Sequence, residues 1–311
     1  MGKTLALYLH RKKRERAIAW KKAKQMKVCY LFLAPFLLCF TLFTLVPIVI
    51  SLVLSFFYYN VLETPKFIGM DNYVNLLLGD DVFITAAKNT FVFAAIIGPV
   101  GYILQFLMAW MINELPPRAR AVMIVVLYAP SISGAAMSIW NLILSSDQYG
   151  YLNSIVVWLG GTPQTWLTNP KYMTIMVIVV SLWGSMGQGF LAFVAGFQGL
   201  DRSQYEAAYV DGIKNRLQEL WYITLPGMKP MLVFGAITSI AGAFNVSDIP
   251  ETLCGNPSTD YAVHTVVTHL KDYGSVRFEM GYASAIATIL FLAMILCNKL
   301  VMALLRRVGT D

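Results

Sequence analysis

Charged residues are scarce in this chain of 311 residues, of which only 13% are Asp, Glu, Lys or Arg while 57% are apolar. Soluble domains are about a quarter charged and close to half apolar. The chain also has only four cysteines and three histidines. Because of this composition we expect a membrane domain rather than soluble domains, and no structural disulfide.

The apolar residues lie in six long runs. A helix needs about 20 residues to cross the hydrocarbon core of a bilayer. The runs are Leu31–Phe57, Thr90–Ile112, Ala121–Leu144, Tyr172–Phe197, Met231–Val246 and Tyr282–Leu305. The first contains Pro35 and Pro47, which membrane helices tolerate. The sequence therefore predicts an all-α, polytopic membrane protein with six transmembrane helices, formed by residues 28–311.

Lys and Arg are distributed unequally between the segments that connect these runs. Nineteen of the 24 lie in segments 1–27, 113–120 and 198–230 and in the tail from Lys299. Because cytoplasmic loops carry the excess of Lys and Arg, both termini and segment 198–230 are predicted to be cytoplasmic. The basic segment 1–27 directly precedes a span, so we interpret it as an anchor to anionic membrane lipid and not as a nucleic-acid arm.

The span interiors hold no acidic or basic side chain before Lys299, near the end of the sixth. Ion-coupled carriers place such side chains within their spans, so a self-contained secondary transporter is the less favoured alternative. Gly2-Lys3-Thr4 is only a fragment of a phosphate-binding loop, so this chain is not expected to hydrolyse ATP. A membrane enzyme is disfavoured too, because no catalytic constellation is recognisable.

Neither a cofactor nor a metal site is expected. His264 and His269 are five residues apart, a spacing that does not bring two side chains to one face of a helix. The polar side chains within the spans are amides, hydroxyls and indoles, which suit a neutral, hydroxyl-rich solute; packing between helices is the alternative role for each. They are Gln105, Ser133, Trp140, Asn141, Ser181, Trp183, Ser185, Gln188 and Asn245.

One polar stretch, Glu206–Pro230, interrupts the apolar pattern. Ser203 and Glu206 have the spacing of a capping box, which predicts a short helix over Gln204–Asp211. Gly212 is suited to end this helix, because glycine adopts the left-handed backbone of a helix C-terminus without strain.

A second short helix is expected at about Asn215–Tyr222. Leu225-Pro226 should end it and redirect the chain, and Pro230 should begin the next span. The stretch is thus predicted to form a rigid helix–turn–helix elbow, with an amphipathic interfacial loop as the plainer alternative.

Glu206-Ala207-Ala208, Gly212 and Ile223-Thr-Leu-Pro226 resemble the EAA loop of permease subunits of ATP-binding-cassette (ABC) importers. The wording is most similar to the carbohydrate-uptake branch related to the maltose permeases. Phe67–Tyr73 resembles the FxGxxNY motif of that branch, and Gly281–Ala285 resembles its GYASA motif. The resemblance extends from about Leu31 to the end of the chain and implies the type I ABC importer permease fold.

The resemblance also implies partners and a place in the cell. A permease of this kind works with a second permease subunit, a pair of ABC ATPase subunits and an extracellular solute-binding protein, in a bacterial plasma membrane. Its EAA loop couples to the ATPase, with Glu206 paired to a basic group there. The residues that match the coupling motif are Glu206, Ala207, Ala208, Asp211, Gly212, Leu225 and Pro226.

The solute path is implied in the same way, since related maltose permeases hold sugar between the third, fourth and fifth spans. The matching positions are Ser133, Ser185, Gln188 and Asn245, with Ser181 as a further candidate. A carbohydrate substrate is expected, and a permease for amino acids or phosphate is the alternative within the ABC importers. The chain departs from the motif in having ten residues between Gly212 and Ile223 where nine are usual, and Arg216 where an aromatic residue is common.

Overall fold

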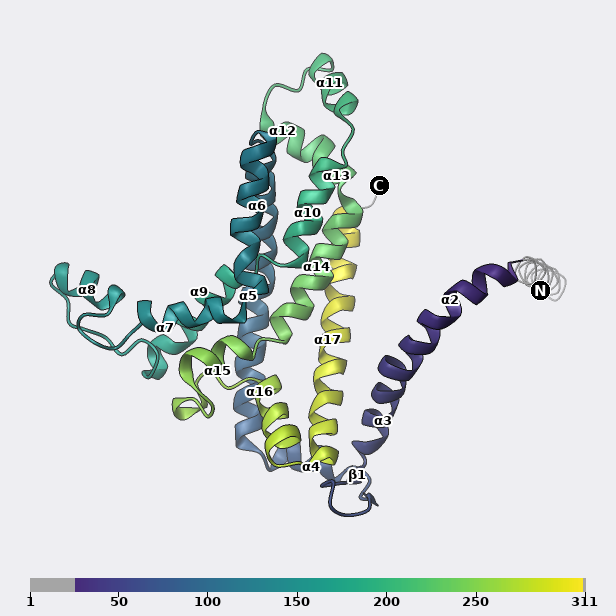
Figure 1. Ribbon diagram of the computed structural model, residues 1–311, viewed down its shortest axis with the longest axis vertical. Helices are drawn as coiled ribbons and strands as arrows, with labels where there is room; N and C mark the ends of the chain where they lie inside the picture. Colours follow the sequence, from purple (N-terminus) through teal and green to yellow (C-terminus); the bar gives the residue numbers. More distant parts are fainter. Residues whose placement is uncertain (1–25, 310–311) are drawn as a thin grey trace. The chain divides into compact units, whose positions relative to one another are not determined.

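The computed structural model describes residues 26–309, so almost all of the predicted basic segment 1–27 lies outside the described residues. The chain divides into two units, Met1–Val53 and Leu54–Asp311. Among the described residues, five helices are long and apolar enough to cross a membrane, and a bent pair of helices would make a sixth span. Figure 1 shows the order of the elements along the chain.

The first unit forms α2 (Lys27–Phe40), a π turn at Thr41–Leu45 and α3 (Val46–Leu54). Together they make one apolar helix over Val28–Leu54, so the span expected at Leu31–Phe57 is present and shifted by three residues. Pro47 has no N–H to donate along the helix, and the wider π turn directly before it lets the helix continue past the proline ring.

The long helices of the second unit pack around α5 (Asp81–Asn113), which makes its most extensive helix contacts with three of the other elements that form spans. These are α9 (Pro170–Gly184), α10 (Gln188–Gln198) and α14 (Lys229–Phe244); α17 (Met280–Gly309) packs on α14. Helix α5 begins nine residues before the predicted Thr90, because the Asp80 side chain caps it by accepting from the Phe83 N–H at 2.8 Å.

The third predicted span, Ala121–Leu144, is wrong as a single helix. Helix α6 (Pro117–Ile132) ends in the middle of this run. Ser133 has an extended backbone, and a 3-10 turn (Gly134–Ser138) then leads into α7 (Ile139–Ile143). The two helical parts are bent by 85°. Pro130, near the end of α6, cannot donate the hydrogen bond that would continue the ladder, which explains a break at this place.

Shorter elements connect the spans and lie mostly at the end of the unit away from the 198–230 segment (Figure 1). We call this the far end and the other the elbow end. A two-stranded antiparallel hairpin pairs Phe57 with Phe67. The remaining elements are β1 (Phe57–Tyr58), β2 (Lys66–Phe67), α4 (Asp71–Leu78), α8 (Tyr151–Trp158), α15 (Asp248–Cys254), a 3-10 turn (Thr259–Tyr261), α16 (Val266–Lys271) and a π turn (Asp272–Val276).

An aromatic cluster joins α5, α10 and α14 toward the elbow end. Phe193 is fully buried, and its ring meets the ring of Phe106 edge-on at 5.5 Å between centroids. Gly235 of α14 makes this packing possible, because a Cβ at that position would lie 2.4 Å from Phe193 Cζ. Helix α10, which begins at Gln188 of the predicted solute path, and α14, which ends directly before Asn245, are thus both held against α5.

Candidate functional site

The first helix of the elbow is α11 (Arg202–Val210), and both of its ends are capped by the chain itself. Asp201, not the predicted Ser203, is the N-cap: its carboxylate accepts from the Ser203 N–H at 3.0 Å. At the other end Gly212 has φ +96° and, as predicted, ends the helix. The Ile213 N–H donates to the Ala208 carbonyl at 3.0 Å, which completes a Schellman motif.

The second part of the elbow runs further than predicted. Helix α12 (Arg216–Glu219) starts after the cap Asn215, and a π turn (Leu220–Thr224) joins it to α13 (Leu225–Gly227), which leads into α14. Pro226 therefore lies inside a helical run and does not end it. A π turn holds one residue more than an α turn, and this one overlaps the end of segment 213–222, which has one residue more than is usual.

A buried carboxylate holds the two parts of the elbow together. Glu219 is 5% exposed at its side chain; it accepts a short hydrogen bond from the Tyr209 hydroxyl on α11 and pairs with Arg216 at 2.9 Å. Burial acts to raise the pKa of Glu219, but the hydrogen bonds from Tyr209 and Arg216 outweigh it and lower that pKa. Glu219 is therefore ionised at neutral pH and ties α11 to α12.

The predicted coupling residues divide into exposed and buried ones. Glu206, Ala207, Asp211, Gly212 and Pro226 are exposed, Leu225 is half-buried, and Ala208 is buried at the Schellman turn. Glu206 makes no ion pair with another residue of the described part of the chain. The exposed side of α11 can thus meet a partner, whereas Ala208 serves the packing of the elbow.

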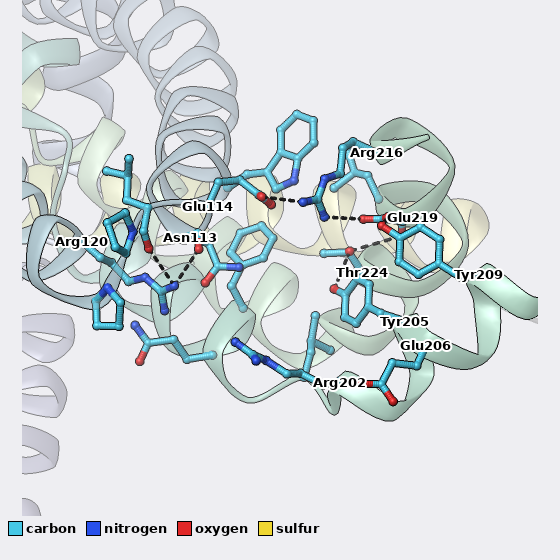
Figure 2. A pocket seen from close by; sticks show the side chains of 18 residues that line it. Asn113, Glu114, Arg120, Arg202, Tyr205, Glu206, Tyr209, Arg216, Glu219 and Thr224 are labelled. Atoms are coloured by element: carbon cyan, nitrogen blue, oxygen red, sulfur yellow. Dashed lines mark hydrogen bonds and ion pairs between the residues drawn. The ribbon is translucent and has the colours of Figure 1, made fainter. Parts of the chain in front are cut away.

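An elbow pocket of about 860 Å³ lies between the elbow and the elbow ends of α5, α6 and α10 (Figure 2). Its charged lining residues are Glu114, Arg120, Arg202, Glu206, Arg216 and Glu219. One ion pair crosses it, between Arg216 Nη2 and Glu114 Oε2 at 2.9 Å. Arg120 donates to the Asn113 and Leu115 carbonyls and so caps the C-terminus of α5.

A second cavity, the span pocket, has a volume of about 360 Å³ and lies between α5, α9, α10 and α14. Three of the four predicted path residues line it, namely Ser185, Gln188 and Asn245. Ser133 does not: it is the exposed residue at the break after α6. The break that the prediction missed is what removes Ser133 from the wall of the pocket.

The span pocket is built around a second break, between α9 and α10. There the Ser185 carbonyl accepts from Gln105 Nε2 at 2.7 Å and from the Gly187 N–H at 2.6 Å. The hydrogen bond from Gln105 Nε2 fixes the orientation of the Gln105 amide. Its Oε1 then faces Gly189, and a Cβ added at Gly189 would lie only 2.3 Å from that oxygen. Gln105 thus clamps the break from a neighbouring helix.

Three polar atoms that line the span pocket are buried without a hydrogen-bond partner among the described residues: Gln105 Oε1, Ser181 Oγ and Ser239 Oγ. Leaving such an atom unsatisfied costs about 1–3 kcal/mol, so a wall with three of them is suited to a polar occupant. From the sequence, Ser181 was a further candidate for the solute path, whereas Gln105 was noted only as a polar residue within a span, since nothing local shows that α5 and α9 meet at this height.

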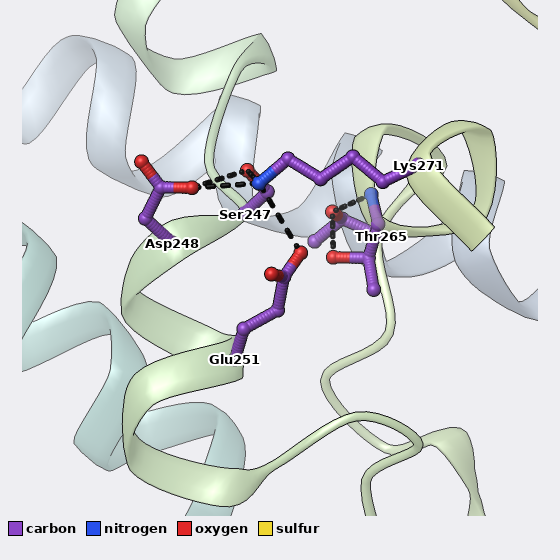
Figure 3. A network of polar contacts seen from close by, with 6 residues as sticks. Ser247, Asp248, Glu251, Thr265 and Lys271 are labelled. Carbon is purple, nitrogen blue, oxygen red and sulfur yellow. Dashed lines mark hydrogen bonds and ion pairs between the residues drawn. The ribbon is translucent and has the colours of Figure 1, made fainter. Parts of the chain in front are cut away.

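A polar clasp borders the span pocket on the far-end side, where α14 breaks at Asn245–Ser247 (Figure 3). Lys271 Nζ lies 2.7 Å from Asp248 Oδ1, 2.9 Å from Ser247 Oγ and 3.4 Å from Glu251 Oε1. Lys271 and Asp248 thus form an ion pair. The single charged residue among the pocket's lining residues is therefore already paired.

Two histidines that were expected to lie apart meet at the far end. His264 Nε2 is 3.2 Å from His269 Nδ1, because Thr265 starts α16 between them and His264 precedes the helix. His269 Nε2 in turn lies 3.0 Å from Asp80 Oδ2. The three groups form a chain instead of converging on one point, and no metal-binding group of three such side chains occurs among residues 26–309.

Comparison with known proteins decides the family. Residues 28–310 match the family described as Binding-protein-dependent transport system inner membrane component. The chain belongs to this family. It is 31% identical over 272 residues to the arabinooligosaccharides transport system permease protein AraP of Bacillus subtilis (strain 168), covering 86% of this chain and 85% of that protein.

Other relatives of this inner membrane component agree. The chain is 31% identical over 223 residues to the lactose transport system permease protein LacF of Rhizobium radiobacter, covering 70% of this chain and 73% of that one. The fold is also similar to that of a chain in the crystal structure of a bacterial alginate ABC transporter in complex with an alginate pentasaccharide-bound periplasmic protein. The TM-score is 0.76 at 24% sequence identity, and the match covers 94% of this chain and 98% of that chain. The predicted ABC permease family and type I fold are confirmed.

Proposed function

We propose that this membrane component is one subunit of an ATP-driven carbohydrate importer, in which it forms half of the solute path. The observation that carries the substrate class is the span pocket, whose polar side chains are amides and hydroxyls apart from the paired Asp248. Neutral donors and acceptors recognise sugar hydroxyls, and relatives are named for arabinooligosaccharides and lactose. An amino acid or phosphate would call for a charged partner in the pocket.

The elbow is the proposed contact with the ATPase subunits, which would supply all of the ATP hydrolysis. Glu206 and Ala207 are exposed on α11, as a docking surface requires, and the Glu219 hydrogen bonds make the elbow a rigid lever. A second permease subunit and an extracellular solute-binding protein would complete the assembly. The elbow end would then be cytoplasmic, together with both termini and the basic anchor 1–27.

Within the span pocket, Ser185, Gln188 and Asn245 are proposed to contact the solute, and Gln105 is added to them. Gln105 lines the pocket and its Oε1 has no hydrogen-bond partner among the described residues, while its Nε2 donates to the Ser185 carbonyl. Ser133 belonged to the predicted path, but its position outside the pocket wall argues against a direct contact in this conformation.

The test begins with purification of the tagged chain from its native membrane. We expect an ABC ATPase and a second permease to co-purify, and the complex in proteoliposomes to import a neutral oligosaccharide only with ATP and its binding protein. A matched control replaces the ATPase Walker lysine, which should abolish uptake without changing assembly. Uptake driven by an ion gradient without ATP, or import of amino acids in place of saccharides, would overturn the proposal.

A further inference from the structure

The elbow is fixed internally but only lightly attached to the end of α5. Inside the elbow, Tyr209 and Arg216 hold the buried Glu219, and Tyr205 hydrogen-bonds Thr224 at 2.9 Å between the two oxygens. Toward α5, the 860 Å³ pocket intervenes, and the Arg216–Glu114 ion pair spans it (Figure 2).

Arg216 is held unequally by its two carboxylates. Its Nη1 binds Glu219, whose side chain is 5% exposed, and its Nη2 binds Glu114, whose side chain is 46% exposed. Exposed ion pairs contribute roughly 0–1 kcal/mol, whereas a buried, hydrogen-bonded charge is costly to separate from its partner. The guanidinium is therefore a permanent part of the elbow, and Glu114 is the end that can be released.

We propose that Arg216 is a latch that holds the elbow against the end of α5 and lets go of Glu114 when the elbow moves across the pocket. The inference rests on the proposed function and adds a positioning residue to it. Arginine suits this role because its planar fork can bind two carboxylates at once, which a lysine ammonium does with less directional control.

The latch reaches the solute path through α5. Glu114 caps the same helix that carries Gln105 nine residues earlier, about 13 Å along the axis. Gln105 clamps the α9–α10 break, and α10 leads back into the elbow. The closed latch thus holds α5 and the elbow in one arrangement, and its release would give the second arrangement that coupling between the two sites requires.

The test measures ATP hydrolysis and uptake in the reconstituted importer with Arg216→Gln and Glu114→Gln, singly and together. Since the latch favours the position that the elbow adopts alone, each variant should raise ATPase activity without loaded binding protein about two- to fivefold and lower solute imported per ATP. The double variant should equal Arg216→Gln, because Glu114→Gln removes only the Arg216–Glu114 ion pair, which Arg216→Gln has already removed. Arg216→Lys should lie between wild type and Arg216→Gln.

Lys214→Gln is the matched control, because it removes a positive charge from the same exposed segment and leaves the latch intact. Its ATPase activity and import ratio should equal those of wild type. Wild-type values in the assembled Arg216→Gln and Glu114→Gln importers would overturn the latch and leave the proposed function standing. Failure of the wild-type complex to couple ATP to saccharide uptake would instead remove the proposed function itself.

A second experiment does not depend on removing a charge. Cysteines are placed at 114 and 216 in a chain whose four native cysteines are replaced by serine and which still imports. Joining the two cysteines with a bismaleimide should lower the rate of uptake at least tenfold. A chain with only one of the two cysteines, treated in the same way, should keep its activity. Continued uptake by the cross-linked importer would show that the elbow does not leave Glu114.

Discussion

Two buried carboxylates at opposite ends of the second unit are held in the same way. Glu219 at the elbow end accepts from the Tyr209 hydroxyl and pairs with Arg216; Asp80 at the far end accepts from the Tyr282 hydroxyl at 2.9 Å and meets His269 at 3.0 Å. Both carboxylates have lowered pKa values although burial opposes this. The hydrogen bonds from the Phe83 N–H and the Tyr282 hydroxyl, with His269, outweigh burial at Asp80, and those from Tyr209 and Arg216 outweigh it at Glu219.

The basic partners make the difference between the two ends. Arg216 is always charged, while burial lowers the pKa of His269 and keeps it neutral at pH 7. The elbow network is therefore an ion pair that does not respond to pH near neutrality. The far-end network joins an ionised carboxylate to neutral imidazoles that can be protonated. The elbow, which is proposed to move in every transport cycle, is thus held together by an ion pair that stays charged near neutral pH.

The largest expected effect follows from damage to the elbow itself. Gly212→Pro and Glu206→Lys should lower uptake more than tenfold and uncouple it from ATP hydrolysis, while the complex still assembles. Proline cannot adopt the φ of +96° at Gly212, and Glu206→Lys reverses the charge of the exposed docking side. The measurement is labelled-saccharide uptake beside ATPase activity and co-purification.

The control for this pair is Gly212→Asn, because asparagine tolerates a left-handed backbone better than other side chains. It should retain most of the uptake. Normal uptake by Gly212→Pro and Glu206→Lys together would show that the elbow is not the coupling element.

The two carboxylates can be compared directly by neutral substitution. Glu219→Gln should cost about 1.5–3 kcal/mol locally, because it removes hydrogen bonds to a charged group and leaves Arg216 without its buried partner. Asp80→Asn should cost about 1 kcal/mol, since asparagine still caps α5 and His269 carries no charge. Limited proteolysis of the elbow and thermal unfolding of the purified complex measure the two effects. Equal losses would contradict the contrast between the two ends.

Acid should act at the far end and not at the elbow. Burial and the neighbouring His269 lower the pKa of His264 to about 4, whereas an imidazole in the unfolded chain titrates near 6.5. Between these values the unfolded chain binds more protons, so stability is complete above about pH 6.5 and falls as the pH drops toward 4. The unfolding temperature from pH 7.5 to 4.5 measures this loss.

His264→Gln is the matched control for this pH dependence. Its amide still donates a hydrogen bond toward His269 but does not titrate. Its unfolding temperature should depend less on pH over the same range. Proteolysis of the elbow should stay constant from pH 7.5 to 5.5, and a parallel acid response there would contradict the permanent charge of the Glu219–Arg216 pair.

The smallest expected effect is at the neutral pocket between the two ends. Gln105→Leu should raise the solute concentration for half-maximal uptake several-fold, because it removes the free acceptor and the clamp on Ser185. Ser133→Ala should change it little, since Ser133 lies outside the span pocket. The two variants are compared at matched expression levels. A larger effect of Ser133→Ala than of Gln105→Leu on this concentration would show that Ser133 belongs to the solute path.

Local pattern accounts for much of the fold. Runs of about 20 apolar residues predict spans because the backbone must satisfy its own hydrogen bonds in lipid, and five of the six predicted runs contain long helices. The exception is Ala121–Leu144, where Pro130 and Gly134 lie in an apolar run that looks continuous by composition. The cap at Asp201 was missed for a similar reason, because Ser203 also has a suitable capping pattern three residues before Glu206.

The sequence by itself determined where the chain enters the membrane, where the elbow interrupts it and that Gly212 turns the elbow, since each depends on neighbours within a few residues. Only the tertiary structure decided that Gln105 meets Ser185, 80 residues on, that Arg216 meets Glu114, and that Asp80 meets His269, 189 residues on. Such pairs arise because helices distant in sequence pack against α5, and the periodicity of one helix says nothing about which neighbour it faces or at what height.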